Sequence, residues 1–287
     1  MLNIYLSKEF TNEHLCVILT LEIVGAKVAF SGGCLEMLTY FQKGFNYGQD
    51  GPGNRLVIHM QGCNMSCPWC ANPEGLSLSG EQTDDKKSPR KISDKELVKE
   101  VLSCQSLFFD GGGVTFTGGE ATLQFEALRE VLEELKDSGI NTAIETNGTH
   151  PRLEELFSLV DLLIVDCKQV EPIIHEEVTG VSNKNILNNI KKAAIAHPNV
   201  LLRIPLINGF NTSKNDLENF LEFTKEIQTL QTKGSVRFEF LPYHEYGKAK
   251  WEERGEPYMV DDGFVSKETL DAFVQAFQEN GITLIHT

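Results

Sequence analysis

The sequence has no excess of basic residues and no long apolar run. Its 26 Lys and Arg residues face 41 Asp and Glu residues, which gives a formal net charge of −15 at pH 7. Because a phosphate backbone or an anionic lipid surface attracts positive charge, we expect neither nucleic acid nor a membrane among the partners. The most apolar stretch, residues 15–24, contains Thr20 and Glu22. It is much shorter than the roughly 20 apolar residues that span a bilayer.

The chain also lacks the start of a secretory signal and the cysteine pattern of a secreted protein. The segment before residue 15 carries Lys8, Glu9 and Glu13 instead of a basic cluster. The seven cysteines are an odd number, and three of them fall within eight residues. A secreted disulfide framework is smaller and more evenly spaced. We therefore expect a cytoplasmic protein whose tight thiol cluster binds a metal.

Short β-branched runs alternate with amphipathic segments along most of the 287 residues. The expected strands cover residues 55–60, 114–117, 141–146, 162–166, 200–205 and 236–241. The expected helices cover 94–103, 125–138, 153–159, 185–196, 214–229 and 266–279, with a last strand at 282–285. Such alternation gives parallel strands covered by helices, and six units are too few for a closed eight-stranded barrel. We therefore expect an α/β fold, a partial (β/α)6 TIM-like barrel.

Two segments do not follow this alternation. Residues 1–40 are expected to be an N-terminal extension, either a short added strand or a poorly ordered segment, and residues 41–287 are expected to form the main domain. The segment 71–91 is polar and contains Gly75, Gly80 and Pro89, so we expect a loop or lid there.

Three cysteines follow the first expected strand, in the segment Gly62-Cys63-Asn64-Met65-Ser66-Cys67-Pro68-Trp69-Cys70. Spacings of four and three residues let the thiolates converge only if the chain wraps around something small. Three cysteine ligands would leave one iron of a cubane cluster open to bind a second molecule. The alternative is a structural zinc site of three cysteines and one histidine, with His59 as the fourth ligand. The loop alone fits both metals.

Polar clusters follow the other expected strands at the point where each strand ends. They are Gly118-Gly119-Glu120, Glu145-Thr146-Asn147-Gly148, Asp166-Cys167-Lys168, Arg203-Ile204-Pro205 and Leu241-Pro242-Tyr243-His244. Glycines let a ligand approach the backbone closely, and a neighbouring carboxylate can hold an ammonium group. In a parallel barrel the carboxyl ends of the strands share one face, where active sites are built. This pattern favours an enzyme over a zinc- or cluster-stabilised binding protein.

Four motifs together resemble the radical S-adenosylmethionine superfamily. They are Asp50-Gly51-Pro52-Gly53, the Cys63/Cys67/Cys70 loop, Gly118-Gly119-Glu120 and Leu241-Pro242-Tyr243-His244. Within that superfamily the chain is similar to the glycyl-radical-enzyme activating enzymes, most closely those of pyruvate formate-lyase, from about Phe41 to the C-terminus. Members with a ferredoxin-like insert carry further cysteine clusters. Here the corresponding region holds only Cys104, which resembles the single-cluster branch.

The resemblance implies one [4Fe-4S] cluster held by Cys63, Cys67 and Cys70, with S-adenosyl-L-methionine bound at the open iron. Electron transfer to the sulfonium would give a 5′-deoxyadenosyl radical that takes a hydrogen atom from a glycine of a partner enzyme. The cofactor-binding residues implied by position are Trp69, Cys70, Ala71, Gly118, Gly119, Glu120, Glu145, Asp166, Cys167, Lys168, Arg203 and His244. Of these, Lys168, Asp166 and Arg203 are the expected catalytic residues. Lys168 and Arg203 would supply fixed positive charge for a carboxylate.

The resemblance also implies the partners. They are a glycyl radical enzyme, with pyruvate formate-lyase as the expected one, and flavodoxin or ferredoxin as electron donor. A different glycyl radical enzyme, such as a dehydratase or a decarboxylase, is the alternative. The chain is expected to act as a monomer. It departs from the family pattern at Ala71, where relatives often have His, and at Glu145, where many have Asp.

Overall fold

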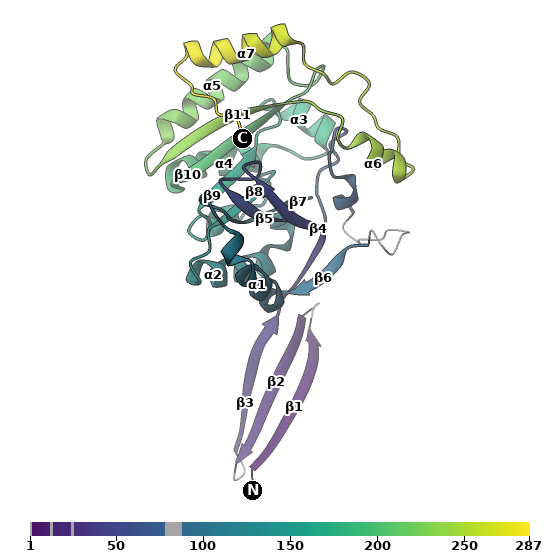
Figure 1. Cartoon of the computed structure of the whole chain (residues 1–287), viewed down its shortest axis with the longest axis vertical. Helices are drawn as coiled ribbons and strands as arrows, with labels where there is room; N and C mark the ends of the chain where they lie inside the picture. Colours follow the sequence, from purple (N-terminus) through teal and green to yellow (C-terminus); the bar gives the residue numbers. More distant parts are fainter. Residues whose placement is uncertain (1, 12–13, 24–25, 78–87) are drawn as a thin grey trace.

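A computed structural model describes residues 2–11, 14–23, 26–77 and 88–287 (Figure 1). Its strands in chain order are β1 (Leu2–Thr11), β2 (His14–Ile23), β3 (Ala26–Leu35), β4 (Met37–Tyr47), β5 (Asn54–Met60), β6 (Arg90–Ser93), β7 (Gly113–Gly118), β8 (Thr142–Thr146), β9 (Leu162–Asp166), β10 (Asn199–Leu206) and β11 (Ser235–Pro242). The α-helices are α1 (Asp94–Ser103), α2 (Phe125–Asp137), α3 (Pro172–Thr179), α4 (Lys184–Ala196), α5 (Lys214–Leu230), α6 (Lys248–Glu253) and α7 (Lys267–Glu279). Short 3-10 helices are η1 (Pro73–Gly75), η2 (Gln105–Leu107), η3 (Ala121–Gln124) and η4 (Leu153–Leu156).

The large sheet has eight strands in the order β11-β10-β9-β8-β7-β5-β4-β6. The six strands from β11 to β5 are parallel, and they are the six strands expected from the sequence. β4 pairs antiparallel with β5 and with β6, so two unexpected strands extend the sheet on one side. β11 and β6 are its two edges, so the sheet is open (Figure 1). The prediction of a partial barrel is confirmed.

Local sequence signals set the ends of several helices. α1 and α5 each begin with a capping box, in which Ser93 pairs with Glu96 and Ser213 pairs with Asp216. In each box the serine hydroxyl accepts a hydrogen bond from a backbone N–H that the helix itself leaves unpaired. Gly139, with φ of +71°, follows the end of α2. The helix expected at 125–138 thus ends where glycine is favoured, because the residue after it has a left-handed conformation.

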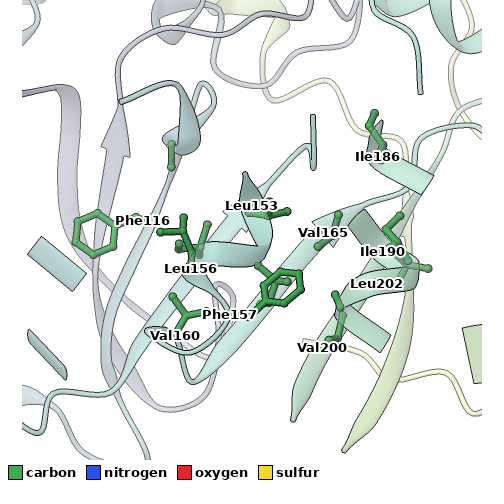
Figure 2. Close-up of a cluster of buried hydrophobic side chains, with 14 of the residues drawn as sticks. Phe116, Leu153, Leu156, Phe157, Val160, Val165, Ile186, Ile190, Val200 and Leu202 are labelled. Atoms are coloured by element: carbon green, nitrogen blue, oxygen red, sulfur yellow. The ribbon is translucent and has the colours of Figure 1, made fainter. Parts of the chain in front are cut away.

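The hydrophobic core lies on both faces of the sheet. On the outer face, Val165 of β9 and Val200 and Leu202 of β10 pack against α4 and η4, and Figure 2 shows this cluster. Side chains alternate along a strand, so Leu201 points to the opposite, inner face. There it belongs to a smaller apolar cluster with Ala143, Leu162 and Ile164. The inner face is therefore apolar near the amino ends of these strands.

Some segments differ from the sequence predictions. The helix expected at 153–159 is only the short 3-10 helix η4. The strand expected at 282–285 makes a single bridge, between Leu284 and Phe238. No sequence pattern predicted α3 or α6.

The N-terminal segment forms strands, and the expected loop is partly described. β1, β2 and β3 form a separate antiparallel sheet that shares no strand with the large one (Figure 1). The expected boundary after residue 40 falls inside β4. Within the expected loop 71–91, residues 78–87 lie outside the described residues, and the rest contains η1 and the start of β6. No helix in the described ranges is long and apolar enough to cross a membrane.

Candidate functional site

The three-cysteine loop leaves the carboxyl end of β5 and is fixed by backbone hydrogen bonds to distant parts of the chain. The Cys63 N–H donates to the carbonyl of Leu76 (3.2 Å), and the Ser66 N–H donates to the carbonyl of Thr179 (2.9 Å). The Asn64 amide donates to the Thr149 hydroxyl (2.9 Å). The loop is therefore held by segments that follow β5, β8 and β9.

A pocket opens at the carboxyl ends of the parallel strands, and most of the predicted site residues line it. These are Cys63, Cys67, Trp69, Cys70, Ala71, Gly118, Gly119, Glu145, Asp166, Lys168 and His244. Asn147, Pro205 and Tyr243, from the polar clusters that follow the strands, also line the pocket, together with Met65, Thr117 and Ile207, for which the sequence predicted no role. The polar ends of separate strands thus meet at one face, as the topology of a parallel barrel requires.

Burial keeps the three thiols protonated in the metal-free chain. It raises the pKa of Cys63 to about 12 and those of Cys67 and Cys70 to about 11. The charge of Lys168, which lines the same pocket, acts in the opposite direction on all three. Because a metal ion bound by a thiol drives off its proton, the low intrinsic acidity of these groups does not prevent them from acting as ligands.

Lys168 and Asp166 form an ion pair inside the pocket, with 2.5 Å between Nζ and Oδ2. Burial by itself lowers the pKa of Lys168, but Asp166 and the neighbouring thiols raise it by more, so the net pKa lies above the ordinary value. Lys168 is therefore a fixed cation at neutral pH. His244 lies at the rim, and its ring stacks on that of Tyr246 with 4.0 Å between centroids. Burial lowers the pKa of His244, which favours the neutral ring.

The glycine pair after β7 packs against backbone at the end of β5. Gly118 has φ of +118°, and a Cβ added there would lie 2.3 Å from the Met60 nitrogen. A Cβ at Gly119 would lie 2.2 Å from the Gly62 carbonyl oxygen. The sequence indicated glycines that allow a ligand to approach. The structure places both beside the pocket, and it also shows that protein backbone already occupies the space of their missing side chains.

Glu120 follows this glycine pair but does not line the pocket. Its side chain is 1% exposed and accepts hydrogen bonds from the Thr122 N–H (3.0 Å) and hydroxyl (2.5 Å). It also accepts from the Thr146 hydroxyl and the Asn147 N–H, both at 2.6 Å. In the structure Glu120 therefore joins the loop after β7 to the end of β8.

Arg203 also does not line the pocket itself, but it supports a residue that does. Its guanidinium donates to Glu145 at 2.5 Å and to Glu239 at 2.9 Å. Asp166, Arg203 and Glu239 are in register across β9, β10 and β11, so their side chains share the inner face. Burial by itself lowers the pKa of Arg203, but the two glutamates raise it above its ordinary value. Glu239 is 2% exposed and was missed, although a lone acidic residue inside an apolar strand was a usable signal.

Two other predicted residues lie away from the pocket. Cys167 is 1% exposed, and burial raises its pKa to about 12. His59, the fourth ligand in the zinc alternative, packs its ring 5.6 Å from that of Phe41, and its Nδ1 has no partner among the described residues. Within the described part of the chain, no three His, Cys, Asp or Glu side chains are arranged to hold a single metal ion. The geometry gives no support to His59 as a zinc ligand.

The fold is an open α/β barrel with three clustered thiols and a fixed cation at its carboxyl face. This arrangement is typical of an enzyme that binds a metal cluster. The family model described as the radical SAM superfamily matches residues 57–224. The chain therefore belongs to the radical SAM superfamily, whose members use an iron–sulfur cluster and S-adenosylmethionine.

Individual proteins that resemble this chain are more informative than the family model. The chain is 36% identical over 220 residues to a pyruvate formate-lyase-activating enzyme of Streptococcus mutans, which covers 74% of this chain and 80% of that protein. It is 35% identical over 217 residues to the pyruvate formate-lyase 1-activating enzyme of Escherichia coli, covering 74% and 83%. The crystal structure of a radical SAM methyltransferase from Sphaerobacter thermophilus aligns with a TM-score of 0.58 at 15% identity, covering 99% of this chain and 76% of that one. This last likeness supports the fold alone.

Proposed function

We propose that this chain is an activating enzyme for pyruvate formate-lyase, in which it installs a glycyl radical. The observation that carries the proposal is the convergence of Cys63, Cys67 and Cys70 with Lys168 and Glu145 in one pocket. The names of the relatives at 33–36% identity point to this activity and to a glycyl radical enzyme as the partner. We further propose that the chain acts as a cytoplasmic monomer that takes electrons from flavodoxin or ferredoxin.

The donor set in the pocket fits one [4Fe-4S] cluster. Three thiols from one loop line the pocket, and no fourth cysteine lines it in the described ranges, because Cys167 is buried away from it and Cys104 lies after α1. Three thiolates leave one iron of a cubane cluster free. With S-adenosylmethionine bound there, a reduced cluster would supply the electron that cleaves it to methionine and a 5′-deoxyadenosyl radical. Cys63, Cys67 and Cys70 would hold the cluster.

The charged residues of the pocket are suited to hold the amino acid end of S-adenosylmethionine. Lys168 presents a fixed cation toward a carboxylate, while Asp166 and Glu145 present acceptors for hydroxyl or ammonium donors. Trp69 lies beside Cys70 and packs its ring 4.7 Å from that of Phe210, which keeps this wall of the pocket apolar. Arg203 fixes the orientation of Glu145 through their 2.5 Å ion pair.

We propose that the peptide with the glycine to be activated enters on the side where the sheet stays open. The sheet ends at β11 and β6 instead of closing, so the barrel wall is incomplete. Glycine suits the reaction because it has no side chain to block the approach to its α-carbon. Since an unproductive adenosyl radical would damage the protein, we propose that cleavage of S-adenosylmethionine awaits a docked glycine segment.

The experiment combines the anaerobically reconstituted protein with purified pyruvate formate-lyase, S-adenosylmethionine and dithionite. We expect an EPR doublet from the glycyl radical, because the unpaired electron couples to the one remaining α-hydrogen. Cys104→Ser serves as the matched control for Cys70→Ser and should keep the signal. A doublet that forms only on a dehydratase or decarboxylase would overturn the assignment of the partner. A colourless protein that binds zinc would overturn the assignment of the cofactor.

A second measurement tests the role of the docked glycine. A short peptide with the glycine and its natural flanks should accelerate the formation of 5′-deoxyadenosine. The same peptide with L-alanine in place of the glycine should do so less, because the added methyl group crowds the hydrogen to be removed. Equal rates without peptide and with either peptide would remove the gating argument and leave the cofactor assignment intact.

A further inference from the structure

The segment between β11 and α7, residues 243–265, lines the pocket at its start and then contacts the cysteine loop. We call this segment the strap. It begins with Tyr243 and His244, which line the pocket, and it contains α6. Its later part is tied down by the hydrogen bond between the Tyr243 and Tyr258 hydroxyls (2.7 Å). The strap is also tied to the rest of the protein by the Asn208 N–H, which donates to the Gly263 carbonyl (3.0 Å).

The α6 part of the strap contacts the last cysteine of the loop. The indole Nε1–H of Trp251 donates to the carbonyl of Cys70 at 3.0 Å, across 181 positions of the sequence. Gly247, just before α6, lies so close that an added Cβ would be 2.2 Å from the same carbonyl oxygen. Its φ of −81° suits any residue, so the absence of a side chain is needed there for space alone. The Lys250 ammonium also reaches Asn72 and Glu74, each at 2.8 Å.

The other two cysteines are anchored differently. Cys63 is held by the Leu76 carbonyl, and the backbone before Cys67 is held by the Thr179 carbonyl. The N–H of Cys70 donates only within the loop, to the Cys67 carbonyl at 3.1 Å. Of the three, Cys70 is therefore the one whose anchor to the rest of the protein is the strap.

We propose that Trp251 is a positioning residue for Cys70, and that Gly247 provides the space that this contact needs. The indole holds the Cys70 backbone so that its thiol stays beside those of Cys63 and Cys67. Because the strap also carries Tyr243 and His244, the same contact fixes the distance between this ligand and the pocket wall. The proposal rests on the proposed role of Cys70 as a cluster ligand, and it does not depend on which partner enzyme is activated.

Two substitutions perturb the contact in different ways. Trp251→Phe keeps an aromatic ring but removes the N–H that binds the Cys70 carbonyl. Gly247→Ala keeps that donor but forces the two backbones apart. Glu256→Gln is the matched control, because it weakens an ion pair with Arg254 just beyond α6, in the same strap, without touching the cysteine loop. Loss of one hydrogen bond corresponds to about a fivefold change in the population of the form in which Cys70 has separated from α6.

The first measurement uses the metal-free protein and does not depend on activity. Each variant is treated with iodoacetamide at fixed pH, and mass spectrometry gives the rate at each cysteine separately. We expect about a fivefold faster reaction at Cys70 in Trp251→Phe and Gly247→Ala, with Cys63 and Cys67 unchanged. The control should match the wild type at all three positions. An unchanged rate at Cys70, or an equal increase at all three cysteines, would overturn the proposal, since the latter indicates general loosening.

The second measurement uses the reconstituted protein. An iron chelator is added, and loss of the visible absorbance of the cluster gives its release rate. Both variants should release iron several times faster than the wild type and the Glu256→Gln control. Release at the wild-type rate in both variants would show that Trp251 does not hold a ligand. If the wild-type protein fails in the glycyl radical assay while the variants show the expected faster alkylation and iron release, the proposed partner is refuted and this inference stands.

Discussion

Replacement of Arg203 by leucine is expected to destabilise the protein strongly, because it removes the cation between the buried carboxylate of Glu239 and the partly buried carboxylate of Glu145. Arg203 is 5% exposed and Glu239 is 2% exposed, so water cannot screen the charge left behind. The guanidinium donates to Glu145 at 2.5 Å and to Glu239 at 2.9 Å. Removal of one partner from a buried ion pair costs about 3–5 kcal/mol. Total stabilities are about 5–15 kcal/mol, so this is a large fraction.

The assay is equilibrium unfolding of the metal-free protein in urea under reducing conditions, with the midpoint followed by circular dichroism. A double-mutant cycle identifies the cause. If the stranded carboxylate is responsible, Arg203→Leu combined with Glu239→Gln should recover at least about 1 kcal/mol relative to Arg203→Leu alone, which is within the range of coupling between contacting residues. A loss below about 1 kcal/mol, or a double variant no more stable than the single one, would refute the reasoning.

Three further predictions concern the cysteines and the N-terminal segment. Serine in place of Cys63, Cys67 or Cys70 should abolish cluster binding, whereas Cys104→Ser should leave iron at about four per chain; iron analysis near eight would contradict a single cluster. A variant that begins at Met37 keeps all of β4 and should remain folded and bind iron, and loss of soluble protein would refute this. Burial raises the pKa values of the three site thiols to about 11–12, above the value of about 8.5 of an unfolded thiol. Stability of the metal-free protein should therefore be fully present below about pH 8.5 and fall as pH rises toward 11; a urea midpoint that stays constant over that range would contradict it.

Much of the fold was predictable because hydrophobic periodicity records which face of an element is buried. The six parallel strands and the long helices α2, α4 and α5 have this signal, and the sequence predicted all of them. β4 was missed because its burial alternates only at its start, from Met37 to Tyr40, and then becomes irregular. α3 and α6 have eight and six residues, which is about two helical turns or fewer, so an apolar stripe is hard to recognise in them.

The candidate site was predicted less completely, because the sequence does not give the direction of each side chain. The polar residues after the strands do converge, since parallel strands bring their carboxyl ends to one face. However, the chain turns at Gly118. The Glu120 side chain then lies inside the protein, where it accepts a hydrogen bond from Thr146, and does not line the pocket. The pairing of Arg203 with Glu239 depends on the register of β10 with β11, and the contact of Trp251 with Cys70 depends on tertiary packing.

The part of the chain that matches the family is not the whole of the site. The match covers residues 57–224, which include the cysteine loop, Glu145 and Lys168. β11 and the strap lie beyond it, yet they supply Glu239, His244 and the anchor for Cys70. The shared segment thus contains the cysteines and most of the groups proposed to bind S-adenosylmethionine, while residues 225–287 complete the pocket wall with His244. Every member of the superfamily must bind a cluster and S-adenosylmethionine, but each has its own substrate. We therefore expect the residues that select the partner to lie outside 57–224.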